Sequence, residues 1–253
     1  MFQAVNKRSI SDEVYDQLCS RIVSQELKAG EELPSERLLS EMLGGSRNAV
    51  REAIKRLQQA RLVDVKQGGL TTVLDYRAEA GAELLPNLLF DRHSQIQVDV
   101  ARSIVRMRQV LSPEIAADAA TQGNADTADR LDAVVAHMRA TNEAEAVQRL
   151  AFQFWEILVE GSGNIAYRLA FNSLRRTYEP LWGLMTQMLS GQQQKLDIFE
   201  RLAMLVRQGQ RDEAARCAKD YIDESSAAIY EFLDLYEQNS QDSANTQIEG
   251  ETQ

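Results

Sequence analysis

The strongest candidate for chemistry is a short basic stretch at residues 46–51. Arg47 and Arg51 are four residues apart, so a helix places both guanidinium groups on one face. Ser46 and Asn48 stand beside them at the N-terminal end. Arginine can donate two hydrogen bonds to O6 and N7 of guanine, and backbone amides at a helix start attract phosphate. The pattern predicts a DNA-reading helix, although a basic face on an isolated helix is more often simply solvated.

Further DNA contacts are expected before and after this helix. Arg37 stands at the start of the preceding predicted helix, where it can reach the DNA backbone or a base. The turn Gln67-Gly68-Gly69 joins two predicted strands, and its small residues allow a close approach to the minor groove. Residues 46–61 include five basic residues and one acidic residue, so Lys55 and Arg56 are expected to add to the local positive charge.

Helical periodicity and turn signals place these residues in an N-terminal domain. Its elements are expected as helices at 11–25, 35–43 and 46–57 and strands at 62–65 and 71–73. Ser11 and Ser35 are candidate N-caps, because a serine oxygen can accept from the free amides of the first turn. Three helices followed by one hairpin are typical of a winged helix-turn-helix. We predict this fold for residues 1–76.

The remainder of the chain has the pattern of successive helices. Residues 77–95 are expected to form a connector, and 96–238 a second domain. Its helices are expected at 96–122, 125–140, 143–161, 164–190, 192–209 and 211–238. The polar segment 239–253 is expected to be a disordered tail. The predicted fold class is mostly α: an N-terminal winged helix-turn-helix followed by an all-α helical bundle of six to seven helices.

Charge is divided unevenly between the two predicted domains. The 253 residues carry a net charge of −10. Residues 1–76 hold 11 basic and 11 acidic residues, whereas residues 77–253 hold 17 and 27. The acidic part is repelled by phosphate, so DNA binding is expected to depend on the local charge of the first domain.

Several other classes of protein are excluded by the sequence. It has neither 18 consecutive apolar residues nor a signal peptide, so we expect no membrane contact and a cytoplasmic location. Cys19 and Cys217 lie far apart in helical patterns and are expected to be small buried side chains. His93 and His137 are not near a recognisable nucleophile motif, and phosphate-binding glycine loops are lacking, so we do not expect an enzyme.

The N-terminal motifs carry a family resemblance. The run LPSERLLSE at 33–41, followed by SRNAVREA at 46–53, resembles the GntR family of bacterial regulators. The motif is specific and covers about residues 9–75. The resemblance implies that Arg37, Arg47 and Arg51 contact DNA. It also implies a palindromic operator in double-stranded DNA, bound by a homodimer.

The C-terminal part is similar to the FadR branch of this family. The likeness rests on RMRQVLSPE at 106–114, Phe154-Trp155 ahead of 162–164, and 207–209 ahead of Ala214-Ala215. Many members of this branch hold a divalent metal with one aspartate and three histidines. The corresponding positions here are Ala151, Trp155, Phe199 and Tyr221. We therefore predict no metal and no cofactor.

Without a metal, the second domain is expected to enclose an aromatic cavity for a larger apolar ligand. The segment Tyr221–Ser225 and Arg108 resemble members of the branch that respond to long-chain acyl-CoA. The expected effector-binding residues are Arg108, Phe152, Trp155, Tyr178, Phe199, Tyr221 and Ser225, with Phe154 also on the wall. Two alternatives stay open: a small organic acid or other metabolite as the effector, or a closed domain that only dimerises.

Overall fold

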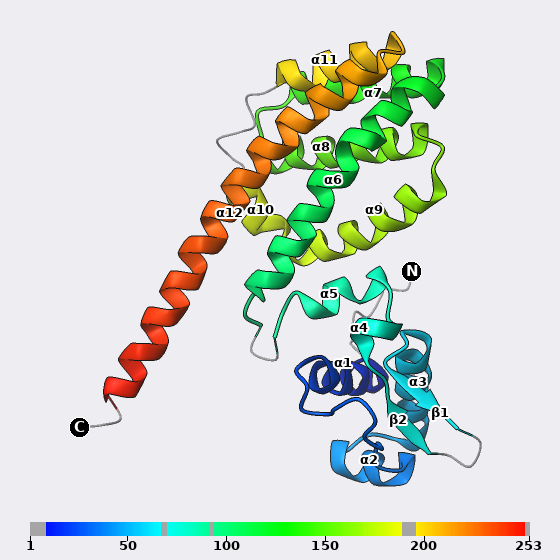
Figure 1. Cartoon of the computed structure of the whole chain (residues 1–253), viewed down its shortest axis with the longest axis vertical. Helices are drawn as coiled ribbons and strands as arrows, with labels where there is room; N and C mark the ends of the chain where they lie inside the picture. Colours follow the sequence, from blue (N-terminus) through cyan, green and yellow to red (C-terminus); the bar gives the residue numbers. More distant parts are fainter. Residues whose placement is uncertain (1–8, 67–69, 92–93, 189–195, 251–253) are drawn as a thin grey trace, which may run out of the picture. The chain divides into compact units, whose positions relative to one another are not determined.

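The computed structural model describes residues 9–66, 70–91, 94–188 and 196–250 of the chain (Figure 1). The chain divides into two compact units, Met1–Gln97 and Val98–Gln253. Each unit has its own buried apolar core, and each is described by itself. Within the described residues, no helix is both long enough and apolar enough to cross a membrane.

The first unit is a winged helix-turn-helix, as predicted. Its elements are helices α1 (Ile10–Val23), α2 (Glu36–Leu43) and α3 (Arg47–Gln59) and strands β1 (Val63–Val65) and β2 (Thr71–Val73). The strands pair antiparallel, with Val63 opposite Val73 and Val65 opposite Thr71. The core gathers the apolar faces of the helices, including Ile22, Val50 and Leu57, each completely buried. This packing fixes which face of α3 remains exposed.

The wing includes an extended segment that the periodicity did not predict. The Gly30 amide donates to the Val73 carbonyl at 2.8 Å, and the Leu33 amide donates to the Thr71 carbonyl at 2.8 Å. The Val73 amide donates to the Glu31 carbonyl at 2.8 Å. The segment before α2 therefore forms hydrogen bonds along the outer edge of β2. Because only four residues take part, they are too few for a recognisable alternation of side chains.

Serine residues cap the three N-terminal helices. Ser35 and Ser46 cap α2 and α3, in agreement with the expected helix starts. For α1 the cap is Ser9 and not Ser11. Ser9 has the more favourable position because Asp12 lies three residues later and completes a capping box, in which the two side chains bond each other's backbone amides.

The segment expected to be a connector is part of the first unit. It folds into α4 (Tyr76–Glu79), the 3₁₀ helix η1 (Ala82–Leu84) and α5 (Leu85–Leu88). Leu84 is 2% exposed and belongs to the core of this unit. The boundary therefore falls after Gln97, later than the expected end of the first domain at residue 76. The amphipathic piece moves the boundary because its leucines are buried against the winged fold.

The second unit is an all-α bundle. Its helices are α6 (Val98–Gln122), α7 (Ala125–Ala140), α8 (Ala144–Gly161), α9 (Ile165–Tyr178), α10 (Trp182–Met188), α11 (Leu196–Arg207) and α12 (Arg211–Gly250). The core forms around α8, where Phe154 and Leu158 are completely buried. Helix α12 packs along α6, and the Gln109 amide donates to Asp223 at 3.0 Å between them.

Two of the predicted helix boundaries in this unit are wrong. The single helix expected at 164–190 is interrupted by the 3₁₀ helix η2 (Glu179–Leu181). Pro180 accounts for the interruption, because proline has no amide hydrogen and its ring clashes with the preceding turn. The last helix was expected to end at 238 but continues to Gly250, and no proline or glycine precedes that residue in α12. The rest of the expected disordered tail, 251–253, lies outside the described residues.

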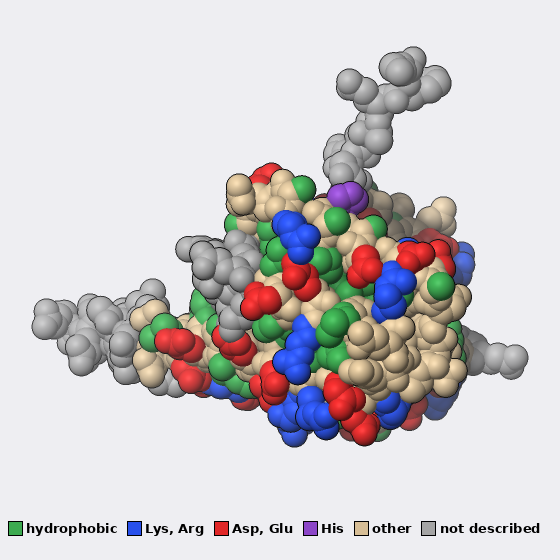
Figure 2. Space-filling model, turned by 90° about the horizontal axis from the view of Figure 1, so that it is seen from above, with side chains coloured by type: hydrophobic (Ala, Val, Ile, Leu, Met, Phe, Trp, Pro, Cys, Tyr) green, Lys and Arg blue, Asp and Glu red, His purple; other side chains and the backbone are tan. Residues whose placement is uncertain are grey.

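Each unit contains one buried cysteine, and the second unit also carries ion pairs on its surface. Cys19 and Cys217 are both buried and unpaired, as expected, and burial raises the pKa of the Cys19 thiol to about 12. On the second unit, Arg207 of α11 bonds Asp129 of α7 at 2.6 Å and Asp132 at 2.7 Å. Figure 2 shows basic and acidic side chains interspersed over the visible surface. Much of the acidic excess is thus close to an arginine.

Candidate DNA-reading face and effector cavity

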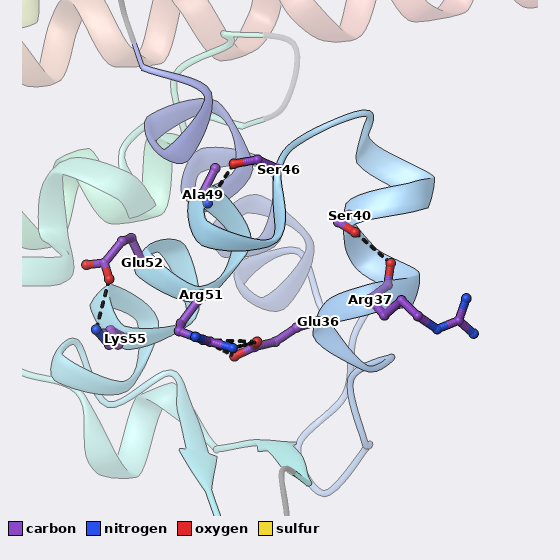
Figure 3. Close-up of polar contacts among 8 residues, drawn as sticks. All are labelled: Glu36, Arg37, Ser40, Ser46, Ala49, Arg51, Glu52 and Lys55. Carbon is purple, nitrogen blue, oxygen red and sulfur yellow. Dashed lines mark hydrogen bonds and ion pairs between the residues drawn. The ribbon is translucent and has the colours of Figure 1, made fainter.

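The first turn of α3 displays the residues that the sequence singled out. The Ser46 hydroxyl oxygen accepts from the Ala49 amide at 3.2 Å, which fixes the start of the helix (Figure 3). Arg47 and Asn48 are exposed. Among the described residues, neither has a hydrogen-bond or ion-pair partner. A basic group and an amide are therefore available to a partner at the N-terminus of the helix.

Arg51 is held by an acid from the neighbouring helix. Its Nε donates to both carboxylate oxygens of Glu36, at 3.3 Å and 3.1 Å, and its Nη2 donates to Oε2 at 2.9 Å. In Figure 3 the two side chains meet between α2 and α3. The hydrogen bonds from Glu36 raise the pKa of Arg51 above its ordinary value, so the guanidinium is charged at every relevant pH. A search of α3 alone could not find this contact, because the two residues are 15 positions apart.

The other basic residues near α3 have local partners. Arg37 bonds Glu41 at 2.7 Å within α2, and Lys55 bonds Glu52 at 2.8 Å within α3. All four side chains are more than half exposed, so the two pairs are weak and easily exchanged for DNA contacts. The exposed face therefore carries both signs of charge.

Arg56 does not belong to this face. Its Nη1 bonds Asp12 of α1 at 2.6 Å, and its guanidinium lies 4.3 Å from the centroid of the Tyr15 ring. The sequence placed Arg56 with the DNA-facing charge. The structure shows that this side chain stacks on α1 and ties the two helices together, and its contribution to DNA binding stays a prediction.

The tip of the wing was also expected to contact DNA. Gln67, Gly68 and Gly69 lie outside the described residues. The last described bond of the hairpin runs from the Lys66 amide to the Leu70 carbonyl at 2.9 Å. Their proposed DNA contact remains a prediction.

The second unit contains a cavity of about 70 Å³ between α6, α8, α9, α10 and α12. Aromatic and aliphatic side chains form most of its wall. The lining residues are Arg108, Leu111, Ser112, Ile115, Gln148, Ala151, Phe152, Trp155, Tyr167, Phe171, Leu174, Tyr178, Trp182 and Tyr221. The structure thus brings together five of the seven predicted effector residues: Arg108, Phe152, Trp155, Tyr178 and Tyr221.

The other two predicted effector residues, Phe199 and Ser225, lie behind the wall. The Phe199 ring packs edge-on against Tyr221, with centroids 5.0 Å apart, and against Phe154 at 5.1 Å. Phe154 is completely buried in the core and does not line the cavity either. The Ser225 hydroxyl accepts from Arg108 Nη2 at 3.0 Å. These residues support wall residues and do not reach the cavity themselves.

Unpaired hydrogen-bond donors are concentrated at this cavity. Trp155 Nε1, the Tyr178 hydroxyl and Trp182 Nε1 are buried and have no partner among the described residues. All three residues line the cavity. A buried donor without an acceptor costs about 1–3 kcal/mol, so a bound group with acceptor oxygens would be favoured here.

Several wall residues were missed by sequence reasoning. Tyr167, Phe171 and Leu174 were not expected there, and with the expected Tyr178 they follow one another at spacings of four, three and four residues along α9. This spacing places them on one face of the helix, and it was a usable signal. Trp182 had no such signal, because its position depends on the break at η2.

The residues at the positions of the family's metal ligands do not fit a metal. Ala151, Trp155 and Tyr221 line the cavity, and Phe199 contacts Tyr221. A methyl group, an indole and a phenyl ring offer no lone pair to a divalent ion. Among the described residues, no three His, Cys, Asp or Glu side chains are grouped in a way that could hold a metal. Burial instead raises the pKa of the Tyr221 phenol, which keeps it neutral.

Comparison with known proteins matches both units. Residues 10–73 match the family described as bacterial regulatory proteins, gntR family, and residues 103–224 match the FCD domain. The chain is 36% identical over 231 residues to the HTH-type transcriptional regulator Mce2R of Mycobacterium tuberculosis, covering 91% of this chain and 96% of that protein.

More distant similarities also span most of the chain. The fatty acid metabolism regulator protein of Proteus mirabilis is 24% identical over 202 residues, covering 80% of this chain and 83% of that protein. The solved structure of Lar, described as controlling expression of the Listeria monocytogenes agr system, aligns with a TM-score of 0.52 at 17% identity. It covers 90% of this chain and 99% of that one. At this identity the structural likeness shows the fold alone.

Proposed function

The chain belongs to the GntR family of bacterial regulatory proteins and is a DNA-binding transcriptional regulator, and from this premise we propose that it reads its operator with the first turn of α3. The observation that carries the proposal is the exposure of Ser46, Arg47 and Asn48 at that turn, with Arg47 unpaired among the described residues. Arg51 is one turn further along the same face. Arg37 is proposed to contact the DNA backbone or a base, and the wing tip at residues 67–69, which lies outside the described residues, is proposed to approach the minor groove.

We further propose that two copies bind a palindromic operator. One recognition helix reads only a few base pairs, so a two-fold symmetric dimer doubles the contacts and matches the symmetry of a palindrome. This dimer would place both α3 helices in successive major grooves. The resemblance to family members supports this proposal.

Substitution of Arg47 tests the reading of DNA by α3. The operator is first obtained by selection from random duplex DNA with the full chain. Arg47→Ala should weaken binding to that operator by about 1–3 kcal/mol if the side chain bridges a guanine, because both hydrogen bonds are lost. Fluorescence anisotropy titrations with the selected and a scrambled duplex measure the effect.

The control is Arg21→Ala, which removes the same charge from an exposed position in the last turn of α1. Arg21→Ala should weaken binding to the selected and the scrambled duplex by the same factor. That factor should be smaller than the loss that Arg47→Ala causes on the operator. Equal losses for the two variants on the operator would contradict the placement of Arg47 at a base.

For the effector, we propose a long-chain acyl compound, with acyl-CoA as the leading candidate. In the part of the chain that the structure describes, the cavity has an aromatic wall, one arginine and three donors without partners. These features suit an apolar chain with a carbonyl or carboxylate at one end. A relative of this chain is named a fatty acid metabolism regulator, which supports the same ligand class. A small organic acid, the alternative effector, would accept hydrogen bonds from the same donors but would leave much of the aromatic wall without a contact.

Binding of a long chain requires the cavity to expand. An apolar cavity that binds benzene has a volume of about 150 Å³, whereas the cavity here measures about 70 Å³. The short helix α10 follows a break at η2 and contributes Trp182 to the wall. We propose that this part of the wall moves when ligand enters, and that the ligand thereby selects another arrangement of the domain.

A ligand panel tests the effector proposal. Palmitoyl-CoA, palmitate and small carboxylates are added to the full chain, each with and without chelator, and thermal unfolding is followed. A ligand that binds only the folded protein raises the melting temperature according to RT ln(1 + [L]/Kd). Stabilisation by the long-chain compounds, unaffected by chelator, is the expected result. Stabilisation by small carboxylates alone would favour the alternative effector class, and no response to any compound would favour a domain that only dimerises.

A further inference from the structure

The contact between Glu36 and Arg51 places a negative charge on the proposed DNA-reading face. Glu36 is the first residue of α2, and its carboxylate reaches across to α3. The side chains are 36% and 55% exposed, respectively, so both remain accessible from solvent. An acid at this position is unfavourable for a surface that must approach phosphate, since like charges repel. We therefore expect this acid to have a role in DNA binding that offsets the repulsion.

The geometry of the pair indicates that role. Glu36 accepts from Nε and Nη2, which form one edge of the planar guanidinium. An arginine has five N–H donors, so the other edge keeps donors on Nη1 and Nη2. Two parallel donors on one edge match the O6 and N7 acceptors of guanine. The acid thus holds one edge of Arg51 and leaves the opposite edge available to a base.

Other ion pairs of this face lack that geometry. Arg37 is bonded to Glu41 through Nη1, and Lys55 to Glu52 through its single amine, each within one helix. Neither pair joins two helices or engages two nitrogens of a guanidinium. Only Arg51, among these three cations, has its orientation fixed from a second element.

We propose that Glu36 is a positioning residue that orients Arg51 for base recognition and so determines sequence specificity. This inference rests on the proposed role of α3 in DNA reading. Holding the guanidinium in one orientation reduces the side-chain freedom that would otherwise be lost on binding. The same carboxylate weakens attraction to DNA of any sequence. Glu36 therefore exchanges general affinity for discrimination between sequences.

The substitution Glu36→Gln separates these two effects, because glutamine keeps the shape but removes the charge. Binding to a scrambled duplex should become tighter, since one negative charge near phosphate is gone. Binding to the selected operator should become weaker, since glutamine offers Arg51 one uncharged acceptor oxygen in place of two charged ones and holds it less firmly. We expect the ratio of operator to scrambled affinity to fall about tenfold, within the discrimination that one bidentate contact provides.

The matched control is Glu52→Gln on α3. It removes one negative charge from the same helix, from an acid that pairs with Lys55 and not with Arg51. Both duplexes should bind more tightly by the same factor, so the affinity ratio should not change. Exposed ion pairs contribute little to stability, and equal melting temperatures of both variants and the parent chain will verify correct folding.

A double-mutant cycle with Arg51→Ala shows whether Glu36 acts through Arg51. In the Arg51→Ala background, Glu36→Gln should tighten binding to both duplexes and leave their ratio unchanged. A fall in the ratio of similar size in both backgrounds would overturn the inference. So would a Glu36→Gln variant whose ratio equals that of the parent chain. If the parent chain enriches no sequence from random DNA, the proposed function fails instead, so the two failures are distinguishable.

Discussion

Hydrogen-bond donors without partners distinguish the cavity of the second unit from an ordinary apolar core. The Tyr178 hydroxyl is buried there together with the indole N–H groups of Trp155 and Trp182. Folding has removed these groups from water without giving them an acceptor among the described residues. Such groups lower the stability of the ligand-free protein and increase the gain on binding an acceptor. A substitution at one of them should therefore affect stability and ligand binding in opposite directions.

Tyr178→Phe is the simplest such substitution, because it deletes only the oxygen. We expect the melting temperature of the ligand-free protein to stay the same or rise, since a buried unpaired hydroxyl is removed. Affinity for palmitoyl-CoA, measured by calorimetry, should fall about 2- to 12-fold, equivalent to a typical hydrogen bond of 0.5–1.5 kcal/mol.

Tyr167→Phe provides the control. Tyr167 lines the same cavity, but its hydroxyl is not one of the buried unpaired groups. Tyr167→Phe should leave both the melting temperature and the affinity for palmitoyl-CoA nearly unchanged. A lower melting temperature for Tyr178→Phe with unchanged ligand affinity would mean that the hydroxyl has a structural partner and does not meet the ligand.

The predictability of individual residues depended on where their partners lie. Arg47 was recognisable from α3 alone, since exposure follows from helical periodicity. The contacts of Arg56 could not be foreseen, because its partners, Asp12 and Tyr15, are on another helix. Phe199 was expected in the cavity but supports Tyr221 from behind. Periodicity identifies the buried face of a helix, but it does not distinguish the wall of a cavity from the layer behind it.

At the scale of elements, the start of α1 combines a cap with a contact to α3. The Asp12 carboxylate accepts from the Ser9 amide at 3.1 Å and from the Ser9 hydroxyl at 2.7 Å, and it also bonds Arg56 at 2.6 Å. The hydrogen bonds from Ser9, followed by the one from Arg56, lower the pKa of Asp12 below its ordinary value of 3.8. The charged form is therefore favoured by folding.

Stability should depend on pH through this carboxylate. The pKa of Asp12 is lower in the folded state than in the unfolded state, where it is 3.8. The carboxylate therefore contributes fully to the free energy of unfolding when the pH is above 3.8, and this contribution is lost as the pH falls through the pKa of the folded state. Asp12→Asn should therefore lower the melting temperature at pH 7, and the difference from the parent chain should shrink progressively below pH 3.8. Thermal unfolding, followed by circular dichroism from about pH 2.5 to about pH 7, measures this difference.

Glu13→Gln is the matched control, because it removes an exposed acid from the same turn without touching the cap or Arg56. Its effect at pH 7 should be smaller than that of Asp12→Asn. A constant difference between Asp12→Asn and the parent chain over the whole pH range would show that the carboxylate charge is not the stabilising feature.

Most elements could be predicted from the sequence, because their signals are local. Capping serines, glycine breaks and apolar periodicity were sufficient for α2, α3, β2 and α7. The exceptions depend on longer range or on weak signals. The extended segment before α2 is defined by its hydrogen bonds to β2, and the expected connector belongs to the first unit because Leu84 packs into the core there. The polar composition of residues 239–253 favoured a disordered tail, but α12 continues to Gly250. Composition alone did not take into account that this stretch has no proline or glycine before Gly250 to end the helix.

At the scale of the whole molecule, regulation requires that ligand and operator influence one another. The comparisons assign the first unit to one matched domain and the second unit to another. If a ligand in the second unit changes the affinity for DNA by some factor, DNA must change the affinity for the ligand by the same factor. This reciprocity holds whichever direction the effect takes, and it needs no assumption about how the units are arranged.

We therefore predict equal coupling factors from two separate titrations. In one, the full chain binds operator with and without saturating palmitoyl-CoA; in the other, it binds palmitoyl-CoA with and without saturating operator. Both should give the same change, about 5- to 150-fold. Scrambled DNA at the same concentration is the control, and it should change ligand affinity less. A ligand that binds the cavity equally well with and without operator would occupy the second unit without regulating the first, because equal affinity for two states shifts no equilibrium.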